Sequence, residues 1–534
     1  MTESTPTAAS TPAQQISAGY SVTGQALDLG SVMVGGQVDP AAQIRIPLAM
    51  MNRHGLVAGA TGTGKTKTLQ VIAEQLSAAG VPVVMADFKG DLSGLTRPGE
   101  TNDKIAERSK DTGDQWTGTP FPVEFLSLGT GGIGVPVRAT ISAFGPILLS
   151  KVLGLNQNQE SSLGLIFHYA DQQGLPLLDL KDLRQVISFL TNTDEGKAQL
   201  KSLGAVSSQT AGVILRALIN LEAEGGDTFF GEPEIEPADL IRLDDKGRGI
   251  ITLFELGDQA ARPVMFSTFL MWVLADLFNF LPEVGDVDKP KLVFFFDEAH
   301  LLFKDASKAF LDQVEQTVKL IRSKGVGVFF CTQLPTDVPN SVLSQLGARI
   351  QHALRAFTPD DQQALAKTVR TYPKTEFYDL ATDLTSLGIG EAIVTVLSER
   401  GAPTPVAWTR LRSPRSLMDT IGTDYIKAAA QASPLFLKYG TTVDRESAYE
   451  MLAAKMAPPP SADAPAGDAM DLPPILPTGL DLPPMPAPAE KAEPGMLEQM
   501  MDNPAFKSAM RSAGTVIGRE ITRSIFGTGR RRRR

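Results

Sequence analysis

The chain has few of the residues that build disulfides and metal sites. It holds one cysteine, Cys331, and four histidines among 534 residues. A single cysteine excludes an internal disulfide and is typical of a reducing compartment, so we expect a cytoplasmic protein. The histidines show no metal-ligand spacing with one another or with Cys331, which argues against a zinc site. The net charge is −10, so bulk charge gives no sign of a nucleic-acid partner, although a local basic surface can sit on an acidic protein.

The chain also lacks an uninterrupted membrane-spanning run. The best candidate, residues 264–281, contains Asp276 and Asn279 and is followed by acidic rather than basic residues. We therefore predict a buried helix beneath a sheet, and no membrane partner. The first part of the chain is rich in Thr, Ser, Ala and Pro and lacks the apolar core of a signal peptide.

A glycine-rich segment is the most informative feature that is present. It fits the phosphate-binding loop pattern Gly-x-x-x-x-Gly-Lys-Ser/Thr at every defined position. The segment reads Gly59, Ala60, Thr61, Gly62, Thr63, Gly64, Lys65, Thr66 and Lys67. Apolar residues before it and helical periodicity after it predict strand, loop and helix, which aim backbone N–H groups and a positive helix end at a polyphosphate. We expect this segment to bind ATP, with the Lys65 ammonium at the terminal phosphates and the Thr66 hydroxyl on Mg²⁺; the alternative is a flexible Gly/Thr turn.

A second signal is an apolar strand that ends in two acids. Residues 292–296 are continuously apolar and are followed by Asp297 and Glu298. Asp297 would hold Mg²⁺ opposite the loop hydroxyl, and Glu298 would polarise the attacking water as general base. Strands that end in acids are common, so this interpretation depends on the phosphate loop. Gln333 follows the next apolar strand, residues 326–331, and could sense the terminal phosphate; an ordinary strand-end glutamine is the alternative.

Three arginines are candidates for neutralising charge in the transition state, a role often filled from a neighbouring subunit. Arg322 lies near the end of the helix expected at residues 306–324, and Arg349 and Arg355 lie further on. A surface ion pair is the alternative for each. Asp87, at the end of another apolar strand, fits either a ligand contact or a turn without chemistry.

The alternation of strands and helices predicts an α/β fold with a mostly parallel sheet. The expected organisation is a disordered N-terminus at residues 1–19, the first part of an ATPase core at 20–99, a largely helical insertion at 100–285, the second part of the core at 286–455, a disordered Pro/Ala-rich linker at 456–495 and a basic amphipathic tail at 496–534. The tail ends in five arginines, residues 530–534, which would bind nucleic-acid phosphate or an acidic surface, or simply remain solvated.

Four segments occur in an order that resembles the HerA/FtsK superfamily of hexameric P-loop motors, which includes conjugative coupling proteins. They are GATGTGKT from Gly59, ADFKGDL from Ala86, FDEAH from Phe296 and CTQLP from Cys331. The resemblance is strongest to bacterial HerA-like helicase proteins, a former domain-of-unknown-function family, which share a Gly-Glu-Ala segment like that at Gly390 and a Gly/Arg-rich C-terminal end. It covers about residues 25–455.

The resemblance implies a RecA-like P-loop NTPase core that hydrolyses ATP with Mg²⁺. It implies catalytic roles for Lys65, Glu298 and Gln333, and it places Arg322 and Arg349 where trans-acting arginines lie. It also implies a ring homo-hexamer with nucleic acid, most simply DNA, in the central channel. We therefore expect a DNA translocase or helicase; a motor that moves a protein substrate and a non-motor regulatory ATPase are the alternatives, and the sequence identifies no protein partner.

Overall fold

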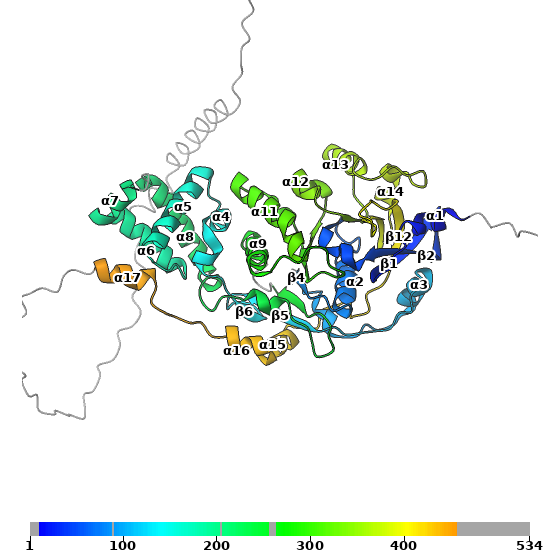
Figure 1. Cartoon of the computed structure of the whole chain (residues 1–534), viewed down its shortest axis with the longest axis horizontal. Coiled ribbons are helices and arrows are strands. Elements are labelled where there is room, and N and C mark those ends of the chain that lie inside the picture. Colours follow the sequence, from blue (N-terminus) through cyan, green and yellow to red (C-terminus); the bar gives the residue numbers. More distant parts are fainter. Residues whose placement is uncertain (1–9, 88–89, 203–205, 256–262, 457–534) are drawn as a thin grey trace, which may run out of the picture. The chain divides into compact units, whose positions relative to one another are not determined.

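The computed structural model describes residues 10–87, 90–202, 206–255 and 263–456, so the predicted linker and basic tail lie almost wholly outside it. The described residues form one twelve-stranded sheet with the order β2-β1-β12-β11-β10-β3-β9-β8-β4-β7-β5-β6. Figure 1 shows β1 and β2 near β12, and β5 near β6. The strands are β1 (Ala26–Val34), β2 (Gln37–Pro47), β3 (Gly55–Ala58), β4 (Val83–Asp87), β5 (Val123–Leu128), β6 (Val135–Val137), β7 (Ile251–Glu255), β8 (Leu292–Phe296), β9 (Val326–Thr332), β10 (Ala348–Gln351), β11 (Glu391–Thr395) and β12 (Ala407–Leu411).

The strands from β10 to β6 all run parallel to their neighbours, whereas β11, β12, β1 and β2 extend the sheet in antiparallel fashion. Parallel neighbours need long crossover connections, which helices supply here. The fold is thus the predicted α/β class, with a mostly parallel sheet. Its central order, β10-β3-β9-β8-β4, sets the strand before the glycine loop next to β9 and one strand away from the acid-bearing β8.

Helices cover both faces of the sheet. They are α1 (Pro12–Ala18), α2 (Lys65–Ala78), α3 (Asp103–Asp111), α4 (Ile141–Val152), α5 (Gln157–Gln172), α6 (Leu180–Asn192), α7 (Asp194–Ser202), α8 (Ser208–Ala223), α9 (Pro263–Phe280), α10 (His300–Phe303), α11 (Lys308–Ile321), α12 (Asn340–Leu343), α13 (Pro359–Val369), α14 (Leu380–Ser386), α15 (Thr423–Ala432), α16 (Pro434–Tyr439) and α17 (Ala448–Met456). The apolar residues of α2 pack against β1, β3 and β4, while α9 and α11 belong to the core of the opposite face.

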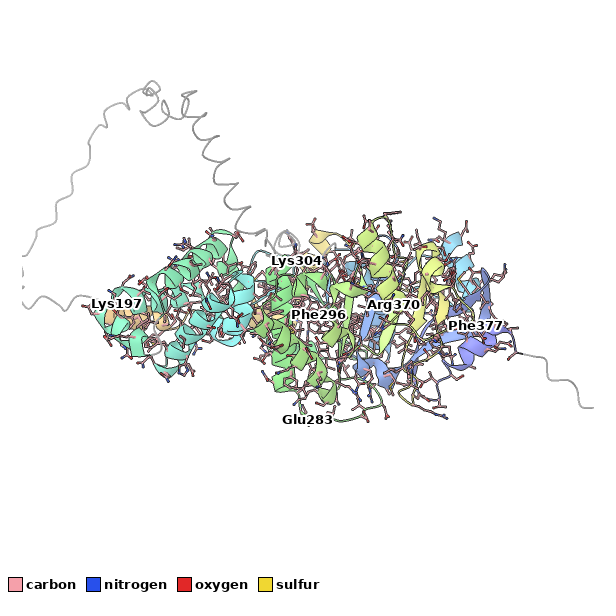
Figure 2. All side chains as sticks on the ribbon, turned by 90° about the horizontal axis from the view of Figure 1, so that it is seen from above. Lys197, Glu283, Phe296, Lys304, Arg370 and Phe377 are labelled. Carbon is pink, nitrogen blue, oxygen red and sulfur yellow. The ribbon has the colours of Figure 1, made fainter. Side chains whose placement is uncertain are left out.

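The central strands lie between these two layers of helices. Because alternate side chains point to opposite faces and both faces are covered, strands such as β8 are apolar at every position. In β8, Phe294 and Phe296 belong to one core cluster, while Val293 and Phe295 belong to the other. Figure 2 shows Phe296 in the interior, and the residue is 1% exposed. The rigid, buried strand β8 therefore fixes the position of the two acids that follow it.

Two expected segments differ from the structure. The predicted insertion at residues 100–285 contains helices α3 to α9, but its strands β5, β6 and β7 join the central sheet, so the stretch is not a separate helical unit. The N-terminus predicted to be disordered contains α1. A capping box between Thr11 and Gln14 starts this helix, and Ile16 is fully buried in the core beside β1 and β2. Burial against the sheet outweighs the Pro/Ser/Thr-rich composition.

The apolar run at residues 264–281 forms the buried helix α9, as predicted. Within the described part of the chain, none of the helices combines the length and the apolar character that a membrane crossing requires.

Candidate active site

The glycine loop joins the buried strand β3 to helix α2, and its glycines are required by its shape. Gly59 has φ 152° and Gly64 has φ 112°, values that residues with a Cβ rarely adopt. A Cβ on Gly59 would lie 2.5 Å from the Cβ of His352, and one on Gly64 would lie 3.2 Å from the Gly390 nitrogen. The loop thus closes tightly on the neighbouring segments, while Gly62 faces open space.

Three neighbouring segments hold the loop by backbone hydrogen bonds. The Gly59 N–H donates to the Thr332 carbonyl (3.2 Å) at the end of β9, and the Ala60 N–H donates to the Ala353 carbonyl (2.8 Å) after β10. The Gly390 N–H donates to the Thr63 carbonyl (3.0 Å). These bonds preorganise a cradle at the first turn of α2, where helix N–H groups lack partners within the helix and favour an anion.

Lys65 and Lys67, both predicted to bind nucleotide, have different surroundings. The Lys65 ammonium folds back on the loop and donates to the carbonyls of Gly59 (2.7 Å) and Ala60 (3.3 Å). The Lys67 ammonium instead donates to the Met418 carbonyl (2.9 Å) and lies 4.0 Å from an oxygen of Asp91. Burial lowers the pKa of Lys67. Only Lys65 is positioned to exchange its loop carbonyls for phosphate oxygens; the Lys67 side chain is engaged elsewhere.

Asp297 and Glu298 follow β8 at the same edge of the sheet. Burial, and then the charge of Glu298, raise the pKa of Asp297, while the Lys65 ammonium and a hydrogen bond with Cys331 lower it. Lys65 and Asp297, distant in the sequence, are therefore within electrostatic reach of each other. The residues present suit Mg²⁺, because a carboxylate and the Thr66 hydroxyl at the start of α2 are hard oxygen ligands beside a phosphate cradle.

Glu298 has an unusual backbone and a defined partner. Its φ of 47° lies in the left-handed region, which is uncommon for a residue with a side chain. Its N–H donates to Asp297 Oδ1 (2.9 Å), and its Oε2 lies 3.2 Å from His300 Nδ1. Strained backbone of this kind is frequent at functional sites. Here it turns the chain sharply at the end of β8 and sets the Glu298 side chain beside His300.

Gln333 follows β9, the strand between β3 and β8, and its side chain is exposed. The turn that carries it is fixed by Asp337, whose Oδ2 accepts from the Thr332 hydroxyl (2.6 Å) and the Leu334 N–H (3.0 Å). The Thr332 carbonyl accepts from Gly59 at the same point. Gln333 therefore lies between the glycine loop and the two acids, the place that a sensing role needs.

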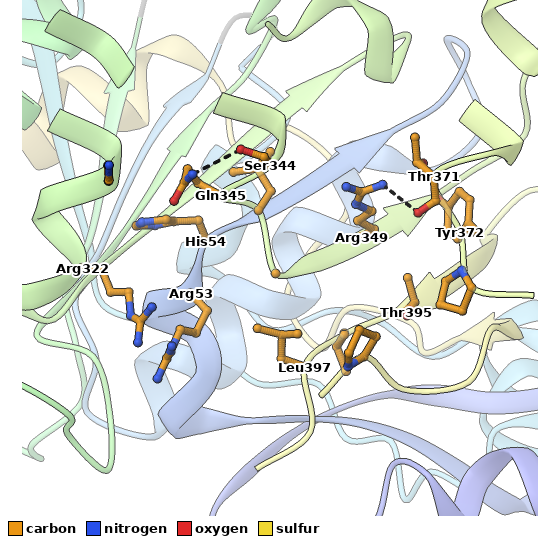
Figure 3. A pocket seen from close by; sticks show the side chains of 16 residues that line it. Arg53, His54, Arg322, Ser344, Gln345, Arg349, Thr371, Tyr372, Thr395 and Leu397 are labelled. Carbon is orange, nitrogen blue, oxygen red and sulfur yellow. Dashed lines mark hydrogen bonds between the residues drawn. The ribbon is translucent and has the colours of Figure 1, made fainter. Parts of the chain in front are cut away.

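The predicted arginines separate into two groups. Arg322 at the end of α11 and Arg349 in β10 lie toward the amino-terminal ends of the strands, away from their own glycine loop, where Arg349 reaches toward the Thr371 carbonyl (Figure 3). Arg355, in contrast, is beside the loop: its Nη2 lies 3.5 Å from the Thr61 carbonyl, and its side chain is exposed. Within one copy of the chain, the structure thus brings Arg355 to the loop, and not Arg322 or Arg349.

Other residues at this edge have structural roles that sequence reasoning missed or left open. His352 follows β10, is buried, and lies 2.9 Å from the Thr68 hydroxyl. Burial, and then the Lys65 charge, lower the pKa of His352 to about 4, so it is neutral at pH 7. The Asp87 carboxylate accepts from the N–H groups of Gly90 and Leu92, which supports the turn interpretation. The sequence signal that could have identified His352 as a neighbour of the glycine loop is its position directly after a strand of the parallel sheet.

The strand, glycine cradle and helix, with an acid-bearing strand two positions away in a parallel sheet, define a P-loop nucleotide-binding protein. More particularly, the chain belongs to the family described as Helicase HerA-like C-terminal, whose model matches residues 34–534.

Relatives of known name agree with this family. The DNA double-strand break repair helicase HerA of Saccharolobus solfataricus is 21% identical over 367 residues, or 68% of this chain and 66% of that protein. The protein of the same name from Sulfolobus acidocaldarius is 21% identical over 385 residues, with the same shares, so this chain spans 66% of the length of either relative. Among solved structures, the bacterial conjugative coupling protein TrwBdeltaN70 is similar with a TM-score of 0.49 and 16% identity, over 76% of this chain and 94% of that one.

Proposed function

We propose that this chain binds ATP with Mg²⁺ at the glycine loop and hydrolyses it. One observation carries the proposal: Lys65 at the start of α2 and Asp297 directly after β8 lie at the same edge of the sheet, beside one preformed anion cradle. The glycines, the helix N-terminus and the acid pair all lie at the carboxyl-terminal edge of the parallel strands, where ligands bind in open α/β sheets.

Each residue has a defined task in this proposal. The loop N–H groups and Lys65 bind the phosphates and stabilise the charge that develops on them. Thr66 and Asp297 would hold Mg²⁺, which neutralises phosphate charge when bound. Glu298 orients a water molecule and accepts its proton, and Gln333 donates a hydrogen bond to the terminal phosphate or the water.

A second copy of the chain would complete the site. Arg322 and Arg349 lie away from their own loop, so we assign them to the nucleotide of a neighbouring copy in a ring, with a hexamer as the expected assembly. Arg355 lies beside its own loop and joins the site in cis.

Nucleic acid is the proposed substrate of the motor. Family membership and two relatives named as DNA repair helicases support translocation or unwinding of DNA, driven by ATP. We keep the proposed partition into an ATPase core, a helical subdomain and a C-terminal tail, and the cytoplasmic location stays a prediction from the single cysteine.

The test is ATP turnover by the full chain with and without single- and double-stranded DNA, together with mass measurement of the assembly. Stimulation by DNA, lost at high salt, is expected for the nucleic-acid motor. Stimulation by a protein alone would favour the secretion-type motor, and turnover by a monomer that neither affects would favour the regulatory ATPase. Lys65→Ala serves as the inactive control.

A further inference from the structure

A cavity of about 450 Å³ lies at the amino-terminal edge of the sheet, at the opposite ends of the strands from the glycine loop. Figure 3 shows side chains that line it, among them Arg53, His54, Arg322 and Arg349. Arg53 and His54 precede β3, Lys319 and Arg322 end α11, and Arg349 lies in β10. We refer to it as the amino-edge cavity.

The amino-edge cavity has an unbalanced charge. Four of its lining side chains are cations, and no carboxylate is among the described residues that line it. His54 adds no positive charge, because burial lowers its pKa to about 4 and its Nδ1 accepts from the Val328 N–H (3.0 Å). Neighbouring positive charges repel one another unless an anion lies between them. In addition, Arg53 Nε is buried and has no hydrogen-bond partner in the described part of the chain, a cost that a bound acceptor would remove.

One carboxylate, that of Asp286, contacts two of the cations and indicates which donors an anion would use. Asp286 Oδ1 lies 3.4 Å from Arg53 Nη2 and 4.0 Å from Arg322 Nη2, so a single oxygen is shared between two guanidinium groups. The Asp286 side chain is 88% exposed, and exposed pairs of this kind are weak. A small anion with several oxygens would compete with Asp286 for the same donors and could also contact the other cations that line the cavity, Lys319 and Arg349.

We propose that the amino-edge cavity is a receptor for a phosphoryl oxyanion, in which Arg53 and Lys319 act together with Arg322 and Arg349. Guanidinium groups match such oxyanions in shape and charge, and the cavity volume suits a phosphoryl group better than a polymer. The oxyanion comes either from free phosphate or from a nucleotide held by a second copy of the chain. The second source rests on the proposed function, whereas the first does not.

Free phosphate is tested by calorimetric titration of the full-length Lys65→Ala variant, whose own glycine loop lacks its ammonium, at constant ionic strength. Adding Arg53→Gln is expected to weaken phosphate binding about tenfold, because a charged hydrogen bond is lost. Adding Asp286→Asn is expected to tighten binding about two- to fivefold, because a competing carboxylate is removed. Lys197→Gln, an exposed lysine in α7, removes the same charge elsewhere and is expected to change nothing.

Arg53→Lys guards against a trivial loss of fold: it keeps the charge but lacks the guanidinium geometry, so its phosphate affinity is expected to lie between those of the Arg53 protein and the Arg53→Gln variant. The second source is tested by measuring the ATP turnover of Arg53→Gln, which this source predicts to be lost, and then by mixing this variant with Lys65→Ala. If the cavity receives the nucleotide of a neighbour, mixed assemblies pair an intact loop with an intact cavity and regain ATP turnover.

Phosphate binding that responds in opposite directions to Arg53→Gln and Asp286→Asn supports the free anion, and restored turnover supports the second copy. Phosphate binding that is absent or unaffected by both changes, together with a mixture that stays inactive, overturns the proposal. Failure of the wild-type chain to hydrolyse ATP would instead defeat the proposed function, and the phosphate titration would still decide the status of the cavity.

Discussion

Glu255 is expected to make the protein less stable as the pH rises, and Glu255→Gln to remove this effect. The residue ends β7 directly opposite Asp87 at the end of β4, and it is 1% exposed. Its Oε1 has no hydrogen-bond partner within the described residues. Burial, then the charges of Asp87 and Asp91, raise the pKa of Glu255 from 4.5 to about 9. The folded protein therefore holds a proton at neutral pH that the unfolded chain releases.

The sign and size follow from proton linkage. Where the folded state binds the extra proton, each pH unit costs about 1.4 kcal/mol of unfolding free energy. The contribution of Glu255 to the free energy of unfolding is fully present below the pKa that Glu255 has in the unfolded chain. This contribution is lost as the pH rises toward the higher pKa that Glu255 has in the folded protein. Between pH 5 and pH 8 the loss from this one group is at most about 4 kcal/mol. Glutamine has nearly the same shape and does not titrate, so the variant lacks this loss.

Thermal melts of wild type and Glu255→Gln at pH 5, 6, 7 and 8 measure the effect. We expect similar midpoints at pH 5 and a progressively higher midpoint for the variant toward pH 8, by several degrees. Glu283→Gln makes the same chemical change at an exposed position and controls for net charge. A difference between wild type and Glu255→Gln that stays constant from pH 5 to pH 8 would show that Glu255 is ionised in the folded protein, and would refute the reasoning.

Three further predictions concern the candidate site. Lys65→Ala should reduce ATP turnover about a hundredfold or more with an unchanged melting midpoint, as measured by phosphate release and thermal melts; preserved turnover would remove the loop from the mechanism. Glu298→Gln should lower turnover by about 10²–10⁴-fold while nucleotide binding, followed by a fluorescent ATP analogue, is retained; an equal loss of binding would assign Glu298 to binding instead. Gly59→Ala should weaken nucleotide binding and lower the melting midpoint, because its Cβ would lie 2.5 Å from the Cβ of His352, whereas Gly62→Ala, which meets nothing, should have a smaller steric effect.

The site was accessible to sequence reasoning where its chemistry is local. The glycines and Lys65 all lie within residues 59–65, and the backbone angles of Gly59, Gly62 and Gly64 favour glycine whatever the rest of the chain does. Asp297 could be predicted as well, because a continuous apolar strand that ends in an acid has few possible positions in a parallel sheet. The neighbours that hold the loop, Ala353 and Gly390, could not be predicted, because their contacts depend on the pairing of distant strands.

The same limit explains the errors in the fold. The strands β5 and β6 lie between irregular segments and are short, so their apolar residues gave no periodicity strong enough to join them to the sheet. The helix α1 has only seven residues, and its stability depends on Ile16 packing against β1 and β2. The resemblance implied a role for Arg322 and Arg349 and none for Arg355, although Arg355 alone among the three lies beside the loop in its own copy, since the turn after β10 decides its direction.

The two edges of the sheet are joined by the strands that carry the catalytic candidates. Arg53 and His54 lead into β3 and the glycine loop, and Arg322 precedes β9, which ends next to Gln333. These two strands pair in parallel register from Gly55 and Phe329 onward, and His54 ties them together at the amino-terminal edge through Val328. Two cations of the amino-edge cavity are thus connected along the chain to the two paired strands whose other ends carry the glycine loop and Gln333, so the proposed oxyanion site and the candidate active site occupy opposite ends of the same strands.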